Sequence, residues 1–326
     1  MKTPRKKIVV SEFIDASAIE SLERHFDVHA DATLVDQPGL LRDLLADADA
    51  LIVRNRTQVT AALLDGAPRL AVVGRLGVGL DNIDVGACGA RGIHVIPATG
   101  ANARAVAEYV IAASLVLLRG AYLSSDAVAQ GQWPRPALSN GREVAGSTMA
   151  VIGFGGIGQL VAQLACALGM RVVGYDAHIP ADAACWRETA TRCAPFADAL
   201  RAADVVSVHV PLVDSTANLL GAAQLSTLKP HAVVINTSRG GVIDERALAD
   251  ALKHGRLGGA ALDVFADEPL KAGSPLAGAP NLILTPHIAG LTVQSNARVS
   301  TLIASRVTDA LLDDRRAATI SQGVST

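Results

Sequence analysis

Short apolar runs of strand length recur along the whole chain, separated by stretches that have the apolar period of a helix. The runs are rich in β-branched residues and contain few polar ones, which is typical of parallel strands covered by helices on both faces. They cover residues 8–10, 51–54, 70–75, 93–97, 148–152, 171–176, 205–211, 232–237, 259–265 and 281–285. This alternation predicts an α/β fold built from two doubly wound parallel sheets.

One connector and three helices organise the chain further. Small residues at 98–102 predict a boundary between two units, and amphipathic helices are predicted near 16–26 and 292–314. A helix predicted at 104–119 is apolar around most of its circumference, which suits burial between a sheet and either another domain or another subunit. The tail, residues 317–326, is predicted to fray.

The apolar run at 148–152 breaks into a glycine-rich turn, after which a helical apolar rhythm begins. The spacing G-x-G-x-x-G allows a tight turn, a close approach of the backbone to a pyrophosphate, and close packing of helix on strand. The helix that starts there directs unsatisfied N–H groups and its positive dipole end at the phosphates. The residues of this turn expected to bind a dinucleotide are Gly153, Gly155, Gly156, Ile157 and Gly158.

An acidic residue ends the next predicted strand. Asp176 follows Gly158 by 18 residues, near the offset of about 20 at which a carboxylate can accept hydrogen bonds from the adenosine ribose. The same carboxylate would repel a 2′-phosphate. The sequence therefore predicts NAD, rather than NADP, as the cofactor.

Composition narrows the class of protein. The chain has 326 residues, 50% hydrophobic and 18% charged, so we expect two domains with large cores and no wholesale disorder. An aromatic content of 3% argues against a stacking surface for single-stranded nucleic acid. A net charge of −2 gives no general attraction to nucleic acid or to an anionic membrane.

Four cysteines, Cys88, Cys166, Cys185 and Cys193, lie apart in the sequence with no metal-type C-x-x-C pair. We therefore expect reduced thiols, no metal site and a cytoplasmic location. Only three apolar residues follow the basic start of the chain, too few for a signal peptide. No run approaches the roughly 18 apolar residues of a membrane span.

Polar residues gather after the predicted strands, at the carboxyl ends where doubly wound sheets bind their ligands. Arg239 follows one strand, Glu268 follows the next, and His287 follows the last. In the first unit, Arg75 and the turn at 77–79 also end a strand. The sequence predicts that the two units face each other across a cleft lined by these residues.

Five ordered motifs, at compatible spacing, carry a resemblance over nearly the whole chain. They are GRLGVGLDNID at 74–84, GFGGIG at 153–158, NTSRGG at 236–241, ALDVFADEP at 261–269 and TPH at 285–287. In these motifs the chain resembles the D-isomer-specific 2-hydroxyacid dehydrogenase family. The resemblance implies a Rossmann-type NAD-binding domain at 102–288 and a smaller, flavodoxin-like substrate domain assembled from 1–101 and 289–326. It also implies hinges near 101–104 and 287–291 and a homodimer formed through the helix at 104–119.

The resemblance implies that Arg239, Glu268 and His287 form the catalytic triad, and the chemistry of these side chains agrees. An imidazole can deliver a proton to a developing alkoxide near neutral pH, and a neighbouring carboxylate favours the imidazolium and orients the ring. A guanidinium can polarise the substrate carbonyl and hold its carboxylate with paired donors. Taken singly, a histidine next to proline is often structural, an arginine after a strand is usually a surface ion pair, and Glu-Pro usually marks a turn.

The resemblance implies further contacts around the cofactor and the substrate. Asp263 would contact the nicotinamide carboxamide, and Thr237 with the backbone of His209 and Pro211 would line the ring pocket. Thr216 would reach the phosphates. For these residues the alternative is packing at the strand ends. A second clamp for the substrate carboxylate would come from the backbone N–H groups of Leu76, Gly77, Val78 and Gly79.

Two arginines, Arg54 and Arg75, end strands in the first unit, in the patterns V-R-x-x-T and G-R-x-G-x-G-x-D-N. These patterns resemble the phosphoglycerate dehydrogenase branch, where such arginines meet a distal phosphate. We therefore expect a substrate with a second anion on the carbon next to the hydroxyl-bearing one, either 3-phosphoglycerate or 3-sulfolactate. The alternative for Arg54 is a solvated, salt-bridging side chain.

Segments 98–102, 239–242 and 287–290 resemble sulfolactate dehydrogenases more closely, and the regulatory extension common in phosphoglycerate dehydrogenases is not expected here. These features favour (S)-sulfolactate; sulfur outranks the carboxyl carbon in naming priority, so the D-type arrangement is called S. A glyoxylate or hydroxypyruvate reductase is a further alternative, and it would leave Arg54 unexplained. A non-enzyme alternative is an NAD-sensing corepressor of the C-terminal-binding-protein type.

Overall fold

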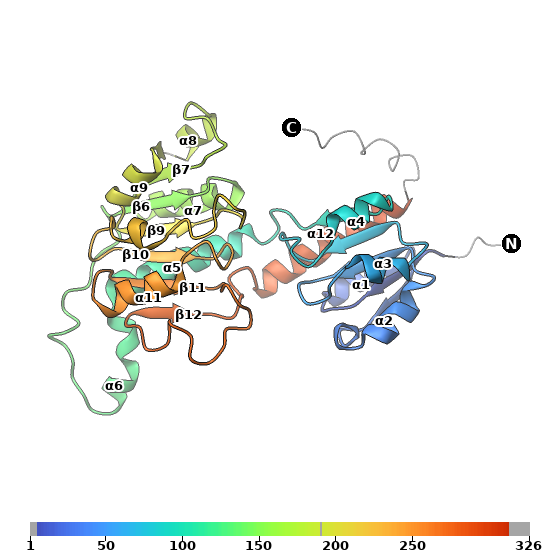
Figure 1. Ribbon diagram of the computed structural model, residues 1–326, viewed down its shortest axis with the longest axis horizontal. Coiled ribbons are helices and arrows are strands. Elements are labelled where there is room, and N and C mark those ends of the chain that lie inside the picture. The colour runs from blue at the N-terminus through green and yellow to red at the C-terminus, as the bar shows by residue number, and fades with distance from the viewer. Residues whose placement is uncertain (1–4, 190, 313–326) are drawn as a thin grey trace. The chain divides into compact units, whose positions relative to one another are not determined.

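The computed structural model describes residues 5–189 and 191–312, which belong to two compact units coloured along the chain in Figure 1. The first unit comprises Met1–Asn102 with Leu291–Thr326, and the second unit is Ala103–Gly290. The chain therefore leaves the first unit once and returns to it. The sequence predicts these two crossings at 101/102 and 288/289, and in the structure the boundaries of the compact units lie at 102/103 and 290/291.

The first unit is a five-stranded parallel sheet with the strand order β2-β1-β3-β4-β5. Its strands are β1 (Lys7–Val10), β2 (Asp27–Ala30), β3 (Ala50–Val53), β4 (Val72–Arg75) and β5 (His94–Pro97). Its helices are α1 (Ala16–Glu23), η1 (Leu34–Asp36), α2 (Pro38–Leu45), α3 (Ala61–Asp65), α4 (Val85–Ala90) and α12 (Val293–Leu312). This is the doubly wound order of a flavodoxin-like sheet.

Alternate residues of these strands serve two cores because strand side chains point to opposite faces. One core joins strand residues such as Ile8 and Ile52 to α1 and α12, and the other joins Val9 and Leu51 to α2, α3 and α4. A Cβ on Gly74 of β4 would lie 2.8 Å from the Ile303 side chain, so only glycine lets α12 pack this closely on the sheet. The last helix thus completes the first unit.

The second unit is a seven-stranded parallel sheet with the order β12-β11-β10-β9-β6-β7-β8. Its strands are β6 (Thr148–Ile152), β7 (Arg171–Tyr175), β8 (Arg192–Cys193), β9 (Val205–Val208), β10 (Val233–Asn236), β11 (Gly259–Leu262) and β12 (Leu282–Leu284). Its helices are α5 (Ala103–Arg119), η2 (Ala121–Ser124), α6 (Ser125–Ala129), α7 (Gly156–Ala167), α8 (Ala184–Glu188), α9 (Phe196–Ala202), α10 (Ala222–Leu225) and α11 (Glu245–Lys253). The strand order reverses between β6 and β9, which is where such sheets bind ligands.

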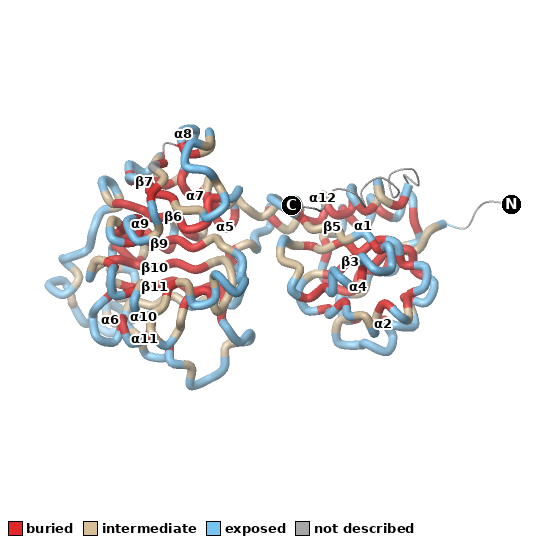
Figure 2. Tube along the Cα trace, turned by 45° about the horizontal axis from the view of Figure 1, so that its top comes forward, coloured by how far each residue is buried: buried red, intermediate tan, exposed pale blue. Residues whose placement is uncertain are grey.

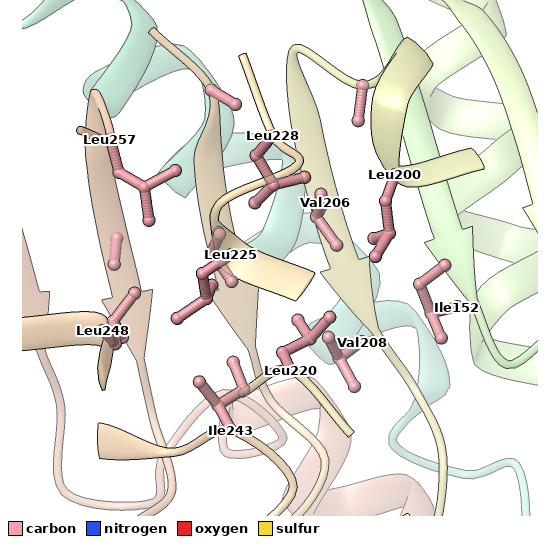
Figure 3. Packing of buried hydrophobic residues seen from close by; sticks show 14 of the residues in the cluster. Ile152, Leu200, Val206, Val208, Leu220, Leu225, Leu228, Ile243, Leu248 and Leu257 are labelled. Carbon is pink, nitrogen blue, oxygen red and sulfur yellow. The ribbon is translucent and has the colours of Figure 1, made fainter. Parts of the chain in front are cut away.

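Two hydrophobic cores also cover the two faces of this sheet. One face packs against α9, α10 and α11 through leucines such as Leu200, Leu225 and Leu248, and Figure 3 shows them in one layer of buried side chains with Val206 and Val208 of β9. The other face packs against α5 and α7. Figure 2 shows the central strands as a continuous buried layer. The predicted class, two doubly wound parallel α/β sheets, is confirmed.

The differences from the predicted elements lie at sheet edges and strand ends. The short edge strands β2 and β8 are not predicted, because β2 is largely exposed and β8 is only two residues long. The predicted strands at 205–211 and 259–265 end at Val208 and Leu262, because the apolar residues that follow belong to loops. Within the described residues α12 ends at Leu312, and the tail predicted at 317–326 lies outside them. Among the described helices, none combines the length and apolar character needed to cross a membrane.

Candidate active site

The glycine turn links β6 to α7 in a conformation that needs its glycines. Gly153 has φ +91°, and a Cβ there would lie 2.6 Å from the His209 carbonyl oxygen. A Cβ on Gly158 would lie 2.2 Å from the carbonyl oxygen of Gly153. By contrast, a Cβ on Gly155 or Gly156 would meet nothing within 4 Å. The first and third glycines of the motif thus hold the turn together, and open space lies beside the second.

The start of α7 fits an anionic ligand. Its N-cap residue, Gly155, has no side chain to accept from the first-turn N–H groups, and the helix is 12 residues long. Uncapped N–H groups and the helix dipole favour a phosphate at this end.

Asp176 lies directly after β7 and holds the glycine turn. Its carboxylate accepts from the N–H of Phe154 at 2.8 Å, of His178 at 2.8 Å and of Ile179 at 3.2 Å. A carboxylate has about four acceptor sites, so these three bonds leave room for a ribose hydroxyl.

Three other predicted cofactor residues, His209, Thr216 and Thr237, lie in the segments that follow β9 and β10. The Thr237 hydroxyl is buried and has no hydrogen-bond partner among the described residues, which fits a polar group supplied by a ligand. Burial lowers the pKa of His209 to about 4, so its imidazole is neutral near pH 7, with Nε2 2.8 Å from Ser207 Oγ. The Thr216 hydroxyl donates to the Pro211 carbonyl at 2.6 Å and accepts from the Val213 N–H at 2.9 Å.

Two members of the predicted triad are in direct contact. Nδ1 of His287 lies 2.8 Å from Oε2 of Glu268, and both side chains are partly exposed. The other carboxylate oxygen of Glu268 accepts from the Phe265 N–H at 3.1 Å. Because a carboxylate only accepts, Nδ1 of His287 carries a proton, and Nε2 remains for a substrate.

The third member, Arg239, follows β10 in a tight segment. Its Nη1 donates to the Ser238 carbonyl at 2.7 Å, and its own carbonyl accepts from Asn236 Nδ2 at 2.9 Å. A Cβ on the next residue, Gly240, would lie 1.8 Å from the Phe265 carbonyl oxygen, so the backbone after Arg239 packs directly against the loop that carries Glu268.

Asp263 is almost fully buried, with an exposed fraction of 1%, and holds the turn that carries His287. Its Oδ1 accepts from Thr285 Oγ1 at 2.6 Å and from the Ile288 N–H at 2.8 Å, and its Oδ2 accepts from the Ala289 N–H at 2.7 Å. His287 has φ +56°, a left-handed conformation that costs a non-glycine residue about 1–3 kcal/mol. The sequence-based role for Asp263, a contact with the carboxamide, can use only the one acceptor site left on Oδ2.

In the first unit, a buried carboxylate shapes the loop after β3. Glu12 accepts from the backbone N–H groups of Arg54 at 2.8 Å, Arg56 at 3.1 Å and Thr57 at 3.0 Å. The Arg54 guanidinium donates to Asn296 Oδ1 at 2.5 Å and lies over the Phe13 ring, 5.7 Å from its centroid. Arg54 is therefore a half-buried, oriented cation.

Arg75 ends β4 beside this loop, since Val53 and Arg75 are register partners. Its Nε donates to the Gly79 carbonyl at 2.9 Å, and its guanidinium covers Gly77, where a Cβ would lie 2.0 Å from Nη1. The N–H of Leu76 donates to the Val53 carbonyl and that of Gly77 to the Arg75 carbonyl, each at 2.8 Å. Of the four N–H groups expected from the sequence to clamp the substrate carboxylate, those of Leu76 and Gly77 are therefore already bonded to backbone carbonyls.

Some residues of these sites carry no signal in the sequence analysis. Glu12 and Asn296 reach Arg54 from opposite ends of the chain, and no motif connects them. The Tyr109 hydroxyl of α5 lies 2.6 Å from Thr285 Oγ1, a contact that the sequence does not predict. Thr285 could have been found, because it begins the TPH motif.

Comparison with known proteins agrees with this geometry. Residues 111–289 match the model of the D-isomer specific 2-hydroxyacid dehydrogenase NAD-binding domain. The chain is 51% identical to the (S)-sulfolactate dehydrogenase of Chromohalobacter salexigens over 93% of this chain and 98% of that protein. It is 38% identical to the D-3-phosphoglycerate dehydrogenase of Methanocaldococcus jannaschii over 92% of this chain, and spans 56% of that longer protein.

The similarity to a solved structure also extends over nearly the whole chain. The crystal structure of the TT0316 protein from Thermus thermophilus superposes with a TM-score of 0.84 at 32% identity, covering 94% of this chain and 97% of that one. The residues of the glycine turn, Asp176 and the orphaned Thr237 hydroxyl fit the dinucleotide that the matched domain binds. The chain is therefore a member of the D-isomer specific 2-hydroxyacid dehydrogenase family, and its second unit contains the family's NAD-binding domain.

Proposed function

We propose that this protein is an NAD-dependent (S)-3-sulfolactate dehydrogenase, which interconverts (S)-sulfolactate and sulfopyruvate. The observation that carries the proposal is the 51% identity to a sulfolactate dehydrogenase over 98% of that protein's length. The half-buried Arg54 supports it, because a cation held in place beside an aromatic ring suits a fixed anionic group on the substrate. In this proposal 102–288 is the cofactor domain, and 1–101 with 289–326 is the substrate domain.

NAD, when bound, accepts the hydride released from C2 of the hydroxy acid. The residues of the chain handle the proton and the charges. As the C2–H bond breaks and the carbonyl forms, the hydroxyl proton passes to Nε2 of His287 and from there to water. Glu268, 2.8 Å from Nδ1, stabilises the imidazolium that forms and keeps the ring oriented. The neutral His209 does not compete as a proton carrier near pH 7, because burial lowers its pKa to about 4.

The two anionic ends of the substrate need separate partners. Arg239 would polarise the C2 oxygen and hold the C1 carboxylate with paired donors. Arg54 and Arg75 would hold the distal sulfonate. A guanidinium has five donors, so the bond of Arg54 to Asn296 leaves donors for the anion.

The direct test measures NAD reduction and NADH oxidation by the purified protein against three substrate pairs: sulfolactate with sulfopyruvate, 3-phosphoglycerate with phosphohydroxypyruvate, and lactate with pyruvate. We expect the highest kcat/KM for the sulfonate pair. A preference for small acids with neutral tails would keep the enzyme class and refute the distal-anion assignment. Absence of turnover with all three pairs would refute the proposed activity.

D-3-phosphoglycerate is the second candidate substrate, favoured by the 38% identity to a D-3-phosphoglycerate dehydrogenase. Both substrates place a tetrahedral oxyanion on the carbon next to C2, so Arg54 and Arg75 serve either. The two pairs in the panel separate them. A higher kcat/KM for phosphoglycerate would replace sulfolactate while leaving the roles of the arginines intact.

We also propose a homodimer formed through α5. The exposed stripe of this helix joins α7 in an almost wholly apolar groove, which a second copy would cover. The residues that line it are Glu108, Ile111, Ala112, Leu115, Leu164, Ala167 and Leu168. In light scattering, we expect a dimer for the native protein and a monomer for Leu115→Glu. The matched control is Val85→Glu, which changes a similarly exposed side chain on α4 and should leave the dimer intact.

A cytoplasmic location is proposed as well. All four cysteines are free thiols, and reduced thiols suit a reducing compartment. Fractionation of cells that express the protein should recover it with cytoplasmic markers, and recovery from the periplasm would refute this location.

A further inference from the structure

A chain of three side chains runs from α5 to the turn that carries His287. The Tyr109 hydroxyl lies 2.6 Å from Thr285 Oγ1, and Thr285 Oγ1 lies 2.6 Å from Asp263 Oδ1. Because a carboxylate only accepts, the Thr285 hydroxyl must donate to Asp263, and Tyr109 must donate to Thr285. The direction of both hydrogen bonds is therefore determined.

Asp263 connects this chain of hydrogen bonds to the backbone around His287. Its carboxylate holds the N–H groups of Ile288 and Ala289, and its carbonyl accepts from the His287 N–H at 2.9 Å. His287 is thus held on both sides while its φ stays at +56°. Such a conformation persists only where the surrounding contacts determine it.

Tyr109 is well placed to stabilise this arrangement. It belongs to α5, a 17-residue helix packed against the sheet, so its ring has a rigid support. Burial, aided by the Asp263 charge and opposed by the bond to Thr285, raises the pKa of the Tyr109 phenol, which therefore remains a donor at neutral pH. The ring provides the packing, and among the described residues the hydroxyl adds one hydrogen bond, to Thr285.

We propose that Tyr109 is a positioning residue for His287, acting through Thr285 and Asp263 to keep the imidazole in register with Glu268 and with the substrate hydroxyl. The inference rests on the proposed function, since it takes His287 to be the proton carrier. Tyr109 does not touch the reacting atoms. It restricts the Thr285 hydroxyl to one orientation, and with it the Asp263 oxygen that defines the turn.

The test uses Tyr109→Phe, which removes the hydroxyl and keeps the ring. We expect kcat to fall about 3- to 10-fold, the effect of losing one neutral hydrogen bond. KM and the Kd for NADH should change less than about 2-fold, because neither ligand contact is altered. The matched control is Tyr122→Phe, whose ring is exposed and lies outside this chain of bonds.

Thr285 provides a second pair of variants. Thr285→Ser keeps the hydroxyl and should retain most of the activity, whereas Thr285→Val should lower kcat at least as much as Tyr109→Phe. Equal losses in the serine and valine variants would overturn the proposal, because the hydroxyl would then be irrelevant. So would a Tyr109→Phe variant with native kcat.

A spectroscopic experiment tests the positioning role of Tyr109 without relying on the proposed activity. Long-range ¹⁵N–¹H spectra of the free protein report which ring nitrogen of His287 carries the proton, and the His287→Gln variant assigns the signal. We expect the Nδ1-protonated form in the native protein and a loss of that preference in Tyr109→Phe. An unchanged His287 signal in Tyr109→Phe would overturn the positioning role. Failure of the native protein to oxidise any hydroxy acid would refute the proposed function alone.

Discussion

Asn296→Ala should weaken the enzyme's preference for a substrate with a distal anion, although Asn296 belongs to a different part of the sequence from the arginine that it supports. Its Oδ1 accepts from Arg54 Nη2 at 2.5 Å, and the Arg54 guanidinium lies 5.7 Å from the centroid of the Phe13 ring. Burial lowers the pKa of Arg54, and the nearby Glu12 carboxylate opposes that shift. Asn296 and Phe13 therefore hold a partly desolvated cation in one orientation.

The size of the effect follows from what each variant removes. Without Asn296 the Arg54 side chain is mobile, and immobilising a long side chain when a ligand binds costs about 0.5–1.5 kcal/mol. Asn296→Ala should therefore lower kcat/KM for sulfolactate about 2- to 13-fold. Arg54→Ala would remove the proposed hydrogen bond between the guanidinium and the substrate sulfonate. A hydrogen bond to a charged group is worth about 1.5–3 kcal/mol, so kcat/KM should fall about 10- to 150-fold.

The assay compares kcat/KM for sulfolactate and for lactate, followed by NADH absorbance. We expect large losses only with sulfolactate. The double variant, Asn296→Ala with Arg54→Ala, should match Arg54→Ala alone, because Asn296 acts through the guanidinium. Arg56→Ala is the control, since that exposed side chain pairs with Asp36. Equal losses with lactate, or additive losses in the double variant, would refute the reasoning.

Three further variants test other parts of the structure. Gly158→Ala would place a Cβ 2.2 Å from the Gly153 carbonyl oxygen. We therefore expect NADH binding to be lost in a fluorescence titration and the free energy of unfolding to fall by about 1–3 kcal/mol. A native affinity for NADH would contradict the role of the turn. Asp176→Ala should improve kcat/KM with NADP relative to NAD by about 10-fold, since it removes a charge that repels the 2′-phosphate, and an unchanged ratio would contradict that role. Burial alone would raise the pKa of Asp204, but its hydrogen bonds, including one from His231 at 2.8 Å, outweigh burial and lower it. The stability that Asp204 contributes is therefore present above the carboxyl's ordinary pKa and is lost as the pH falls through the lowered value. Asp204→Asn should flatten the acid limb of a stability–pH curve measured by urea unfolding. An unchanged acid limb would contradict this role of Asp204.

The periodicity of the chain was sufficient for the fold class. Central parallel strands are buried on both faces, so runs such as residues 148–152 stand out from the helices around them. Edge strands lack this signal: β2 is largely exposed, and its sequence reads as a loop. Strand ends were also misread, because an apolar run continues into a loop wherever that loop packs on the core, as Phe265 does.

The residues of the candidate site also differ in whether the sequence could predict them. Gly153, Gly158 and Asp176 were predictable, because a phosphate-binding turn and the acid after the next strand have a local spacing rule. The contacts of Arg54 with Glu12 and Asn296 were not, because they join segments 42 and 242 residues away. The expected carboxylate clamp also included the N–H groups of Leu76 and Gly77, which the structure commits to neighbouring carbonyls.

The sequence by itself determined the alternation of strands and helices, the glycine turn and the identity of the residues that can carry the chemistry, because each depends on neighbours a few positions apart. The tertiary structure alone decided that α12 returns to pack against Gly74, that Asp263 and Tyr109 support His287, and that Asn296 orients Arg54. Those arrangements arise from the packing of elements distant in sequence. An amphipathic pattern shows that a helix buries one face, but it does not identify the surface on which that face is buried.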